Sequence, residues 1–167
     1  MTDDPLILAR RLSDEGQKTK DFFIGINQEE WSVVLYSDGG GWTIKQLLAH
    51  IVASEVGNRQ MIEEILRGGM GSPENFDLDD FNQGRVKDLE SIPQDKLLVM
   101  FQDYRRSIVD LVKNLNSQDM VLKGRNPYLG ITALEDIIKL VYRHVQIHLR
   151  DARRHLNQHL SSEAPFE

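Results

Sequence analysis

Apolar residues recur at helical spacing in four long stretches of this chain, and this period is the feature that most restricts its fold. An α-helix brings residues three and four positions apart onto one face, whereas a half-buried strand alternates apolar and polar residues. No stretch sustains such an alternation, so we predict an all-α protein. The four predicted long helices cover about residues 5–24, 42–69, 91–116 and 132–159.

Local signals indicate where two of these helices begin. Thr43 with Gln46, and Thr132 with Glu135, each fit the capping-box pattern, in which two side chains satisfy two free backbone N–H groups. They are predicted to open the second and the last long helix. Three consecutive glycines at residues 39–41 exclude a continuous helix before Thr43.

The segment between the second and third long helices reads SPENFDLDDFNQGRVKDLE over most of its length. We expect one short helix in it, at about residues 79–89, and the segment could form a lid or a dimer contact. Residues 117–130 are predicted to be a loop because they contain two glycines and a proline. This pattern indicates a four-helix bundle in a single domain, residues 1–167, ordered over about 3–160. Bundles of this kind pair through flat helix faces, so a homodimer is expected.

The composition excludes several classes of function. None of the 167 residues is a cysteine, so disulfides and thiolate chemistry are excluded, and a metal site would need His, Asp, Glu or water. The formal net charge is −6 and no basic block occurs, so we expect no nucleic-acid partner. We find no signal peptide and no run of about 18 apolar residues, so we expect no membrane span and a cytoplasmic location.

Four of the five histidines gather in the last predicted helix, in YRHVQIHLRDARRHLNQH. His144 and His148 are one turn apart. His144 borders the apolar arc of the helix, and His148 lies within it. Two imidazoles at this spacing on an inward face can share one metal ion. The alternative is two core or interface histidines whose nitrogens bond water and nearby carboxylates. His155 and His159 are predicted to belong to a frayed, solvated end of the helix.

His50 is the one histidine elsewhere, on the edge of the apolar face of the second helix. A third ligand is what an open tetrahedral metal site needs. At about 1.5 Å of rise per residue, His50 lies roughly 10 Å into its helix and roughly 26 Å from the far end. His144 and His148 lie roughly 18 and 24 Å into theirs, so this pair matches His50 better than His155 and His159 do. This holds whether the two helices run parallel or antiparallel.

Glu55 and Asn58 are polar residues within the apolar arc of the second helix. Polar groups on such a face line a cavity or form buried hydrogen bonds, so both are candidate catalytic residues. Glu55 could act as a base or orient a metal-bound water. The alternative is a buried ion pair of Glu55 with Arg85 or with the region of Arg59.

Three short segments resemble motifs of the DinB-like superfamily. WTIKQLLAHIVASE is similar to its second-helix motif, and YRHVQIHLRDAR to the His-x-x-x-His of its last helix. FNQGRV resembles a segment of the group that includes the mycothiol-dependent maleylpyruvate isomerase. The resemblance spans roughly residues 5–160. It implies a four-helix bundle with a divalent metal ion held by His50, His144 and His148.

Relatives with an assigned activity include bacillithiol- and mycothiol-dependent S-transferases, the isomerase and metal-dependent hydrolases. The isomerase has an additional C-terminal domain that this chain lacks, so we do not expect its reaction here. We expect a divalent-metal-dependent enzyme for a small-molecule substrate, either a low-molecular-weight thiol S-transferase or a related hydrolase. Its metal would be zinc or nickel, and the thiol would arrive as a co-substrate. The alternative is a non-catalytic, stress-related binding or dimerisation module.

Asn82 and Arg85, within FNQGRV, are candidates to bind a cofactor or an anionic part of the substrate. Arg presents a forked set of donors that matches a carboxylate, and the segment could fold over the site. The alternative is that Arg85 is structural and ties the segment to the bundle.

Overall fold

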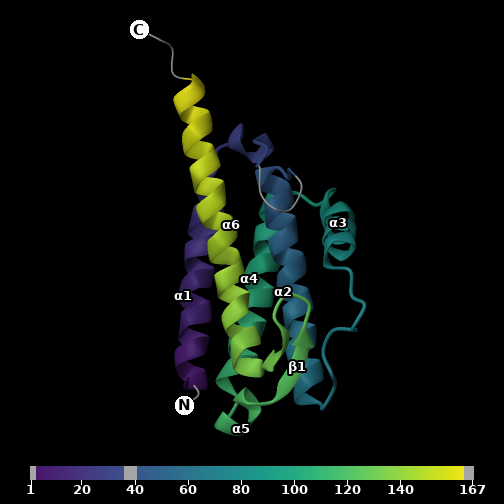
Figure 1. The fold of residues 1–167 in the computed structure, drawn as a ribbon. Coiled ribbons are helices and arrows are strands. Elements are labelled where there is room, and N and C mark those ends of the chain that lie inside the picture. The colour runs from purple at the N-terminus through teal and green to yellow at the C-terminus, as the bar shows by residue number, and fades with distance from the viewer. Residues whose placement is uncertain (1–2, 36–40, 164–167) are drawn as a thin grey trace.

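In a computed structural model the four long helices pack side by side, so the predicted all-α four-helix bundle is confirmed (Figure 1). The structure describes residues 3–35 and 41–163, with side chains up to residue 158. Within these residues, no helix combines the length and the apolar character needed to cross a membrane. The elements are α1 (Pro5–Ile24), η1 (Glu30–Ser32), α2 (Ile44–Leu66), α3 (Leu78–Leu89), α4 (Gln94–Lys113), α5 (Ser117–Met120), β1 (Lys123–Asn126), β2 (Gly130–Ala133) and α6 (Leu134–Glu163).

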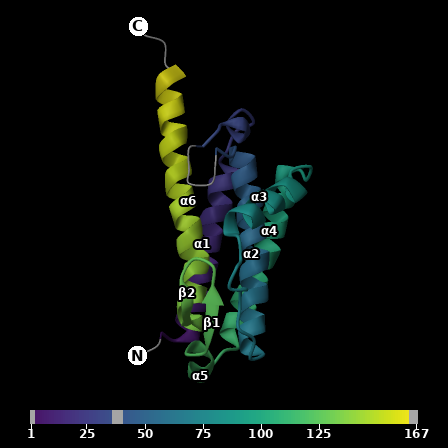
Figure 2. The ribbon, with the colours of Figure 1, turned by 45° about the vertical axis from the view of Figure 1, so that its right-hand side comes forward.

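The long connection between α2 and α4 gives the bundle an up–down–down–up arrangement. α1 packs against α4 and α6, and α2 packs against the same two helices. Figures 1 and 2 show α1 and α6 running in one direction and α2 and α4 in the opposite one. Parallel neighbours such as α2 and α4 need a connection that returns along the bundle. Residues 67–93 provide it, and they contain α3, the predicted short helix.

The structure confirms the capping box predicted for Thr43 and Gln46, at which helix α2 begins. Thr43 Oγ1 accepts a hydrogen bond from the N–H of Gln46 at 3.2 Å, and Gln46 Oε1 accepts one from the N–H of Thr43 at 3.0 Å. Gly41, shortly before this cap, has a φ of +83°, a conformation that favours glycine. The other two glycines of the predicted break, residues 39–40, lie outside the described residues.

A short helix and a β-hairpin replace the loop predicted at residues 117–130, so the prediction of a strand-free chain is wrong there. β1 and β2 pair antiparallel along their whole length. Asn126 Oδ1 closes the turn between them by accepting from the N–H groups of Tyr128, at 2.9 Å, and Leu129, at 3.0 Å. Each strand has four residues, too few for a sustained alternation to be visible in the sequence.

The hairpin also explains why the second predicted capping box is wrong. Thr132 lies within β2, and its hydroxyl donates to Asp136 Oδ2 at 2.9 Å. Glu135 accepts from the backbone N–H of Asp3 at 3.2 Å and from the ammonium of Lys139. Glu135 therefore connects the start of α6 to the start of α1 instead of capping its own helix.

The apolar core forms two clusters, one in each half of the bundle. Each long helix passes from one cluster to the other at a position without an apolar side chain. These boundary positions are Gly16 in α1, Glu55 in α2, Arg105 in α4 and His144 in α6. Burying a polar group costs free energy unless the group is paired, so each of the three polar side chains requires an explanation.

Candidate metal centre

The structure brings together His50 of α2 with His144 and His148 of α6. Nε2 of His144 lies 3.1 Å from Nε2 of His50 and 2.9 Å from Nε2 of His148. One nitrogen from each ring can be chosen so that all three lie within 4.8 Å of one another. Nitrogens bound to one tetrahedral zinc ion at about 2.0–2.1 Å would lie roughly 3.3–3.4 Å apart. The spacing therefore fits a single metal ion.

Helix geometry and helix direction together produce this convergence. His144 and His148 are one turn apart, so they occupy the same face of α6. α2 and α6 are neighbours that run in opposite directions, which selects the antiparallel arrangement of the two considered from the sequence. In that arrangement His50 and His148 were expected at nearly the same height, and their rings have centroids 4.9 Å apart.

Burial within the group of three histidines (hereafter the His cluster) disfavours the charged imidazolium form of His50 and His144. His50 is 3% exposed, whereas His144 and His148 are half-buried, so the cluster is more accessible from the side of α6. Burial, followed by the neighbouring His148, lowers the pKa of His144 to about 3. Burial, followed by His144 and His148, lowers the pKa of His50 well below its ordinary value. His50 and His144 are therefore neutral at pH 7 and have a lone pair available for a metal ion.

The hydrogen bonds within the His cluster are incomplete. A neutral imidazole has one N–H donor and one acceptor nitrogen, and Nε2 of His144 faces two other Nε2 atoms. Nε2 of His144 cannot form good hydrogen bonds with both atoms, because it has either one N–H donor or one lone pair, and each points in a single direction. In addition, Nδ1 of His50 is buried and has no hydrogen-bond partner in the part of the chain that the structure describes. A Lewis acid placed between the three Nε2 atoms would bind the lone pairs that these contacts do not use.

Glu55 forms a buried ion pair with Arg105, an arginine that the sequence analysis did not consider. The Arg105 guanidinium donates from Nε to Oε2 at 2.8 Å and from Nη2 to Oε1 at 2.6 Å. The predicted partners are wrong, because Arg59 binds Glu63 and Arg85 is exposed beside Asp88. Engagement of both carboxylate oxygens favours the structural interpretation of Glu55 over a role as a base. Arg105 lies on the apolar face of α4, between buried Phe101 and Ile108, so the sequence contains a signal for a buried arginine there, although not for its pairing with Glu55.

The remaining predicted residues lie apart from the His cluster. Asn58 is half-buried on α2, eight residues beyond His50, or roughly 12 Å along the axis. Asn82 and Arg85 are on α3, which lies beside α2 and away from α6 in Figures 1 and 2. The exposed Arg85 guanidinium lies 5.3 Å above the ring of Phe81, on its own helix. The catalytic role of Asn58 and the cofactor-binding roles of Asn82 and Arg85 stay predictions.

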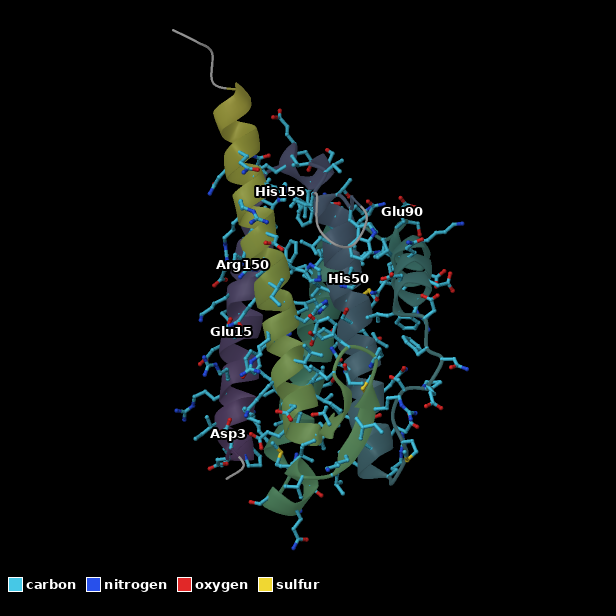
Figure 3. The ribbon with its side chains drawn as sticks, in the orientation of Figure 1. Asp3, Glu15, His50, Glu90, Arg150 and His155 are labelled. Atoms are coloured by element: carbon cyan, nitrogen blue, oxygen red, sulfur yellow. The ribbon has the colours of Figure 1, made fainter. Side chains whose placement is uncertain are left out.

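The end of α6 differs from the prediction. The helix continues to Glu163, so the frayed end expected around His155 is wrong. His155 is half-buried, and its Nδ1 lies 2.9 Å from the carbonyl oxygen of Asp151. Figure 3 shows His155 further toward the C-terminal end of α6 than the level of His50. The His159 side chain lies outside the described residues.

No protein-family model and no curated protein matches this sequence. Among solved structures, YfiT from Bacillus subtilis, described as a probable metal-dependent hydrolase with an unusual four-helix bundle topology, is 18% identical. Its TM-score is 0.75, over 90% of this chain and 85% of its own. Mycothiol-dependent maleylpyruvate isomerase is 14% identical, with a TM-score of 0.68 over 89% of this chain, which spans 59% of that protein.

The colibactin self-resistance protein ClbS, solved in complex with double-stranded DNA, is 13% identical. Its TM-score is 0.66, over 87% of this chain and 93% of its own. At these identities the likenesses show the fold alone, and they agree with the DinB-like resemblance of the sequence motifs.

Proposed function

We propose that the protein is a divalent-metal-dependent enzyme whose metal is bound by His50, His144 and His148. The observation that carries this proposal is the convergence of three imidazole nitrogens from two helices, with separations of 2.9 and 3.1 Å. The neutral forms of His50 and His144 at pH 7 add support, because a metal ion competes with protons for the same lone pairs. Three side-chain ligands also leave a coordination position open, which is typical of catalytic rather than structural sites.

The protein would contribute a neutral donor set and an asymmetric environment. A divalent ion bound by three neutral ligands keeps its full charge, and such an ion lowers the pKa of a bound thiol or water. Buried His50 would anchor one side, while half-buried His144 and His148 leave the opposite side accessible to a small molecule. Zinc and nickel are the expected metals, because both accept imidazole ligands.

Two reactions fit this arrangement, namely transfer of a low-molecular-weight thiol to an electrophile and metal-assisted hydrolysis. The chain has no cysteine, so a reacting thiol would have to arrive as a substrate. Two similar folds are named for related chemistry, one as a mycothiol-dependent isomerase and one as a probable metal-dependent hydrolase. The net charge of −6 favours a small molecule over nucleic acid, although ClbS was solved with DNA. We therefore expect thiol transfer, with hydrolysis as the second reaction to assay.

Metal binding by matched histidine variants tests the site. We expect about one equivalent of zinc or nickel in the wild type by calorimetry and elemental analysis. His148→Ala should weaken binding by at least about 100-fold, the upper end for changes next to a ligand. His155→Ala is the control, because it removes a histidine from the same helix outside the cluster. Unchanged metal content in the variant with all three cluster histidines replaced by alanine would rule out the site.

Stability and turnover provide the second test. Metal at 100 times its wild-type Kd should stabilise the wild type by about 2.7 kcal/mol, or roughly 5–10 °C in Tm, and His148→Ala by at most about 0.4 kcal/mol. Metal-loaded protein should then be screened for thiol transfer to model electrophiles and for ester and amide hydrolysis, with His148→Ala as the inactive control. Stoichiometric metal without turnover in either screen would favour a non-catalytic binding module.

A further inference from the structure

No protein group among the described residues gives His50 the orienting hydrogen bond that metal-ligating histidines ordinarily make. Such histidines donate their second ring N–H to a carboxylate, a carbonyl or water, and this bond fixes both tautomer and ring orientation. Nδ1 of His50 is buried and has no partner among residues 3–35 and 41–163. Among the protein groups, packing is therefore the contact left to orient the ring.

Trp42 lies against the His50 ring. The ring centroids are 4.6 Å apart and the planes are inclined by 38°. The His144 and His148 rings approach His50 differently, since their planes lie at 75° and 79° to it. Trp42 is itself 9% exposed, so its indole shields the imidazole from water. The indole thus restricts how the His50 ring can rotate about its own side-chain bonds.

The backbone around Trp42 is fixed on both sides. The Trp42 carbonyl oxygen accepts from the N–H of Leu35 at 2.8 Å. The next residue, Thr43, forms the capping box of α2, and Ile44 donates its N–H to the Val33 carbonyl at 3.1 Å. These bonds join the segment after η1 to the start of α2. They hold the indole at a fixed place above a histidine two turns into the helix.

We propose that Trp42 is a positioning residue for the metal site, whose indole replaces the missing hydrogen bond in orienting His50. The inference rests on the proposed metal function for its effect on affinity. A metal-bound imidazole is electron-poor, and an electron-poor group near an indole face is stabilised by the ring quadrupole. Trp42 therefore stabilises the metal-bound state more than the metal-free state.

Zinc affinity in four proteins separates this role from simple core packing. The proteins are the wild type, Trp42→Phe, Trp42→Leu and Trp31→Leu. Trp31 is the control because it is the other of the two tryptophans of the chain. It stacks on Phe23, with ring centroids 5.9 Å apart, instead of on a histidine. Affinity is measured by competition with a chromophoric chelator, dissociation is followed in excess EDTA, and metal-free stability is measured by urea unfolding.

We expect Trp42→Leu to bind zinc about 5–30-fold more weakly, mainly through faster dissociation. Trp42→Phe, which keeps an aromatic ring, should stay within about threefold of the wild type. Trp31→Leu should lose stability but keep its zinc affinity. Wild-type affinity in Trp42→Leu, or an equal loss in Trp31→Leu, would overturn the inference.

Nuclear Overhauser effects between the His50 and His144 rings in the metal-free protein distinguish this inference from the proposed function. They should be strong in the wild type and in Trp42→Phe, and weak in Trp42→Leu. Wild-type protein that binds no zinc would remove the proposed function, yet the ring contacts would still decide whether Trp42 orients His50. Unchanged contacts in Trp42→Leu would overturn the positioning role. Should Trp42→Leu fail to fold, Trp42→Met keeps a large apolar side chain without a ring and replaces it in both measurements.

Discussion

The Glu55–Arg105 ion pair and the His cluster both bury polar side chains in the bundle, and they differ in how completely these side chains are paired. In the ion pair both carboxylate oxygens accept hydrogen bonds, and Nη1 of Arg105 donates to the carbonyl oxygen of Leu12 at 3.0 Å. In the His cluster the nitrogens face one another, and one nitrogen of His50 has no partner among the described residues. The ion pair is complete by itself, whereas the cluster is complementary to a Lewis acid.

The two sites share α2 but connect it to different helices. Arg105 links α4 to Glu55 of α2 and to the backbone of α1, and its guanidinium lies 5.2 Å above the ring of Phe101. The His cluster links α2 to α6. Together the two sites connect all four long helices. In the ion pair the charged groups satisfy each other's hydrogen-bonding capacity, whereas in the His cluster Nδ1 of His50 has no partner among the described residues. Removing one partner of such a buried ion pair destabilises the fold strongly, because the remaining charge is buried without compensation.

Breaking the ion pair should produce the largest effect. Arg105→Ala leaves Glu55 buried without a partner, and we expect the free energy of unfolding to fall by about 3–5 kcal/mol. Urea unfolding measures this, with Arg106→Ala as the exposed neighbouring control, expected within about 0.5 kcal/mol of the wild type. The double variant Glu55→Leu/Arg105→Met should recover most of the loss. A small effect of Arg105→Ala alone would show that water or relaxation compensates Glu55.

Protonation should act on the His cluster. His50 and His144 have lowered pKa values when folded, so between pH 6.5 and about 3 the unfolded chain binds more protons than the folded one. The stability of the metal-free protein therefore falls as the pH drops from 7 to 5. The slope approaches about 1.4 kcal/mol per pH unit for each such histidine.

Urea midpoints at pH 7, 6 and 5 in the presence of a chelator test this prediction. Most carboxylates remain charged in this range, so histidines dominate the change. The urea midpoint of His144→Gln should depend less steeply on pH than that of the wild type. The midpoint of His155→Ala should keep the wild-type dependence. Identical slopes in the wild type and His144→Gln would contradict the assignment of the effect to the cluster.

The smallest effect should come from the glycine that makes room for the ion pair. A Cβ at Gly16 would lie 2.8 Å from Cγ of Arg105, whereas one at Gly57, in α2, would meet nothing within 4 Å. Gly57→Ala should therefore stabilise the protein by about 0.5–1 kcal/mol. In Gly16→Ala the same gain competes with about 1–3 kcal/mol of overpacking, so we expect a net loss of about 1 kcal/mol by urea unfolding. Equal stabilisation by both changes would show that Arg105 can move aside at no cost.

Local sequence determined the long helices and placed two of the three candidate metal ligands side by side. The helical period and the Thr43 capping box place α2, and a spacing of four residues places His144 and His148 on one face, whatever surrounds them. The hairpin could not be predicted in the same way. Its strands are four residues long, and β1 also pairs with residue 71, far away in the chain.

The tertiary structure decided which residues meet. Helical spacing left the relative direction of α2 and α6 open, and only their packing brings His50 to His144, 94 residues away. It also decided that Glu55 pairs with Arg105, 50 residues away, and not with an arginine nearer in sequence. Side chains on one helix are related by a fixed rotation and rise, which the sequence specifies. Contacts between helices depend on which direction, height and neighbours bury the most apolar surface while pairing the polar groups, and these properties belong to the whole bundle.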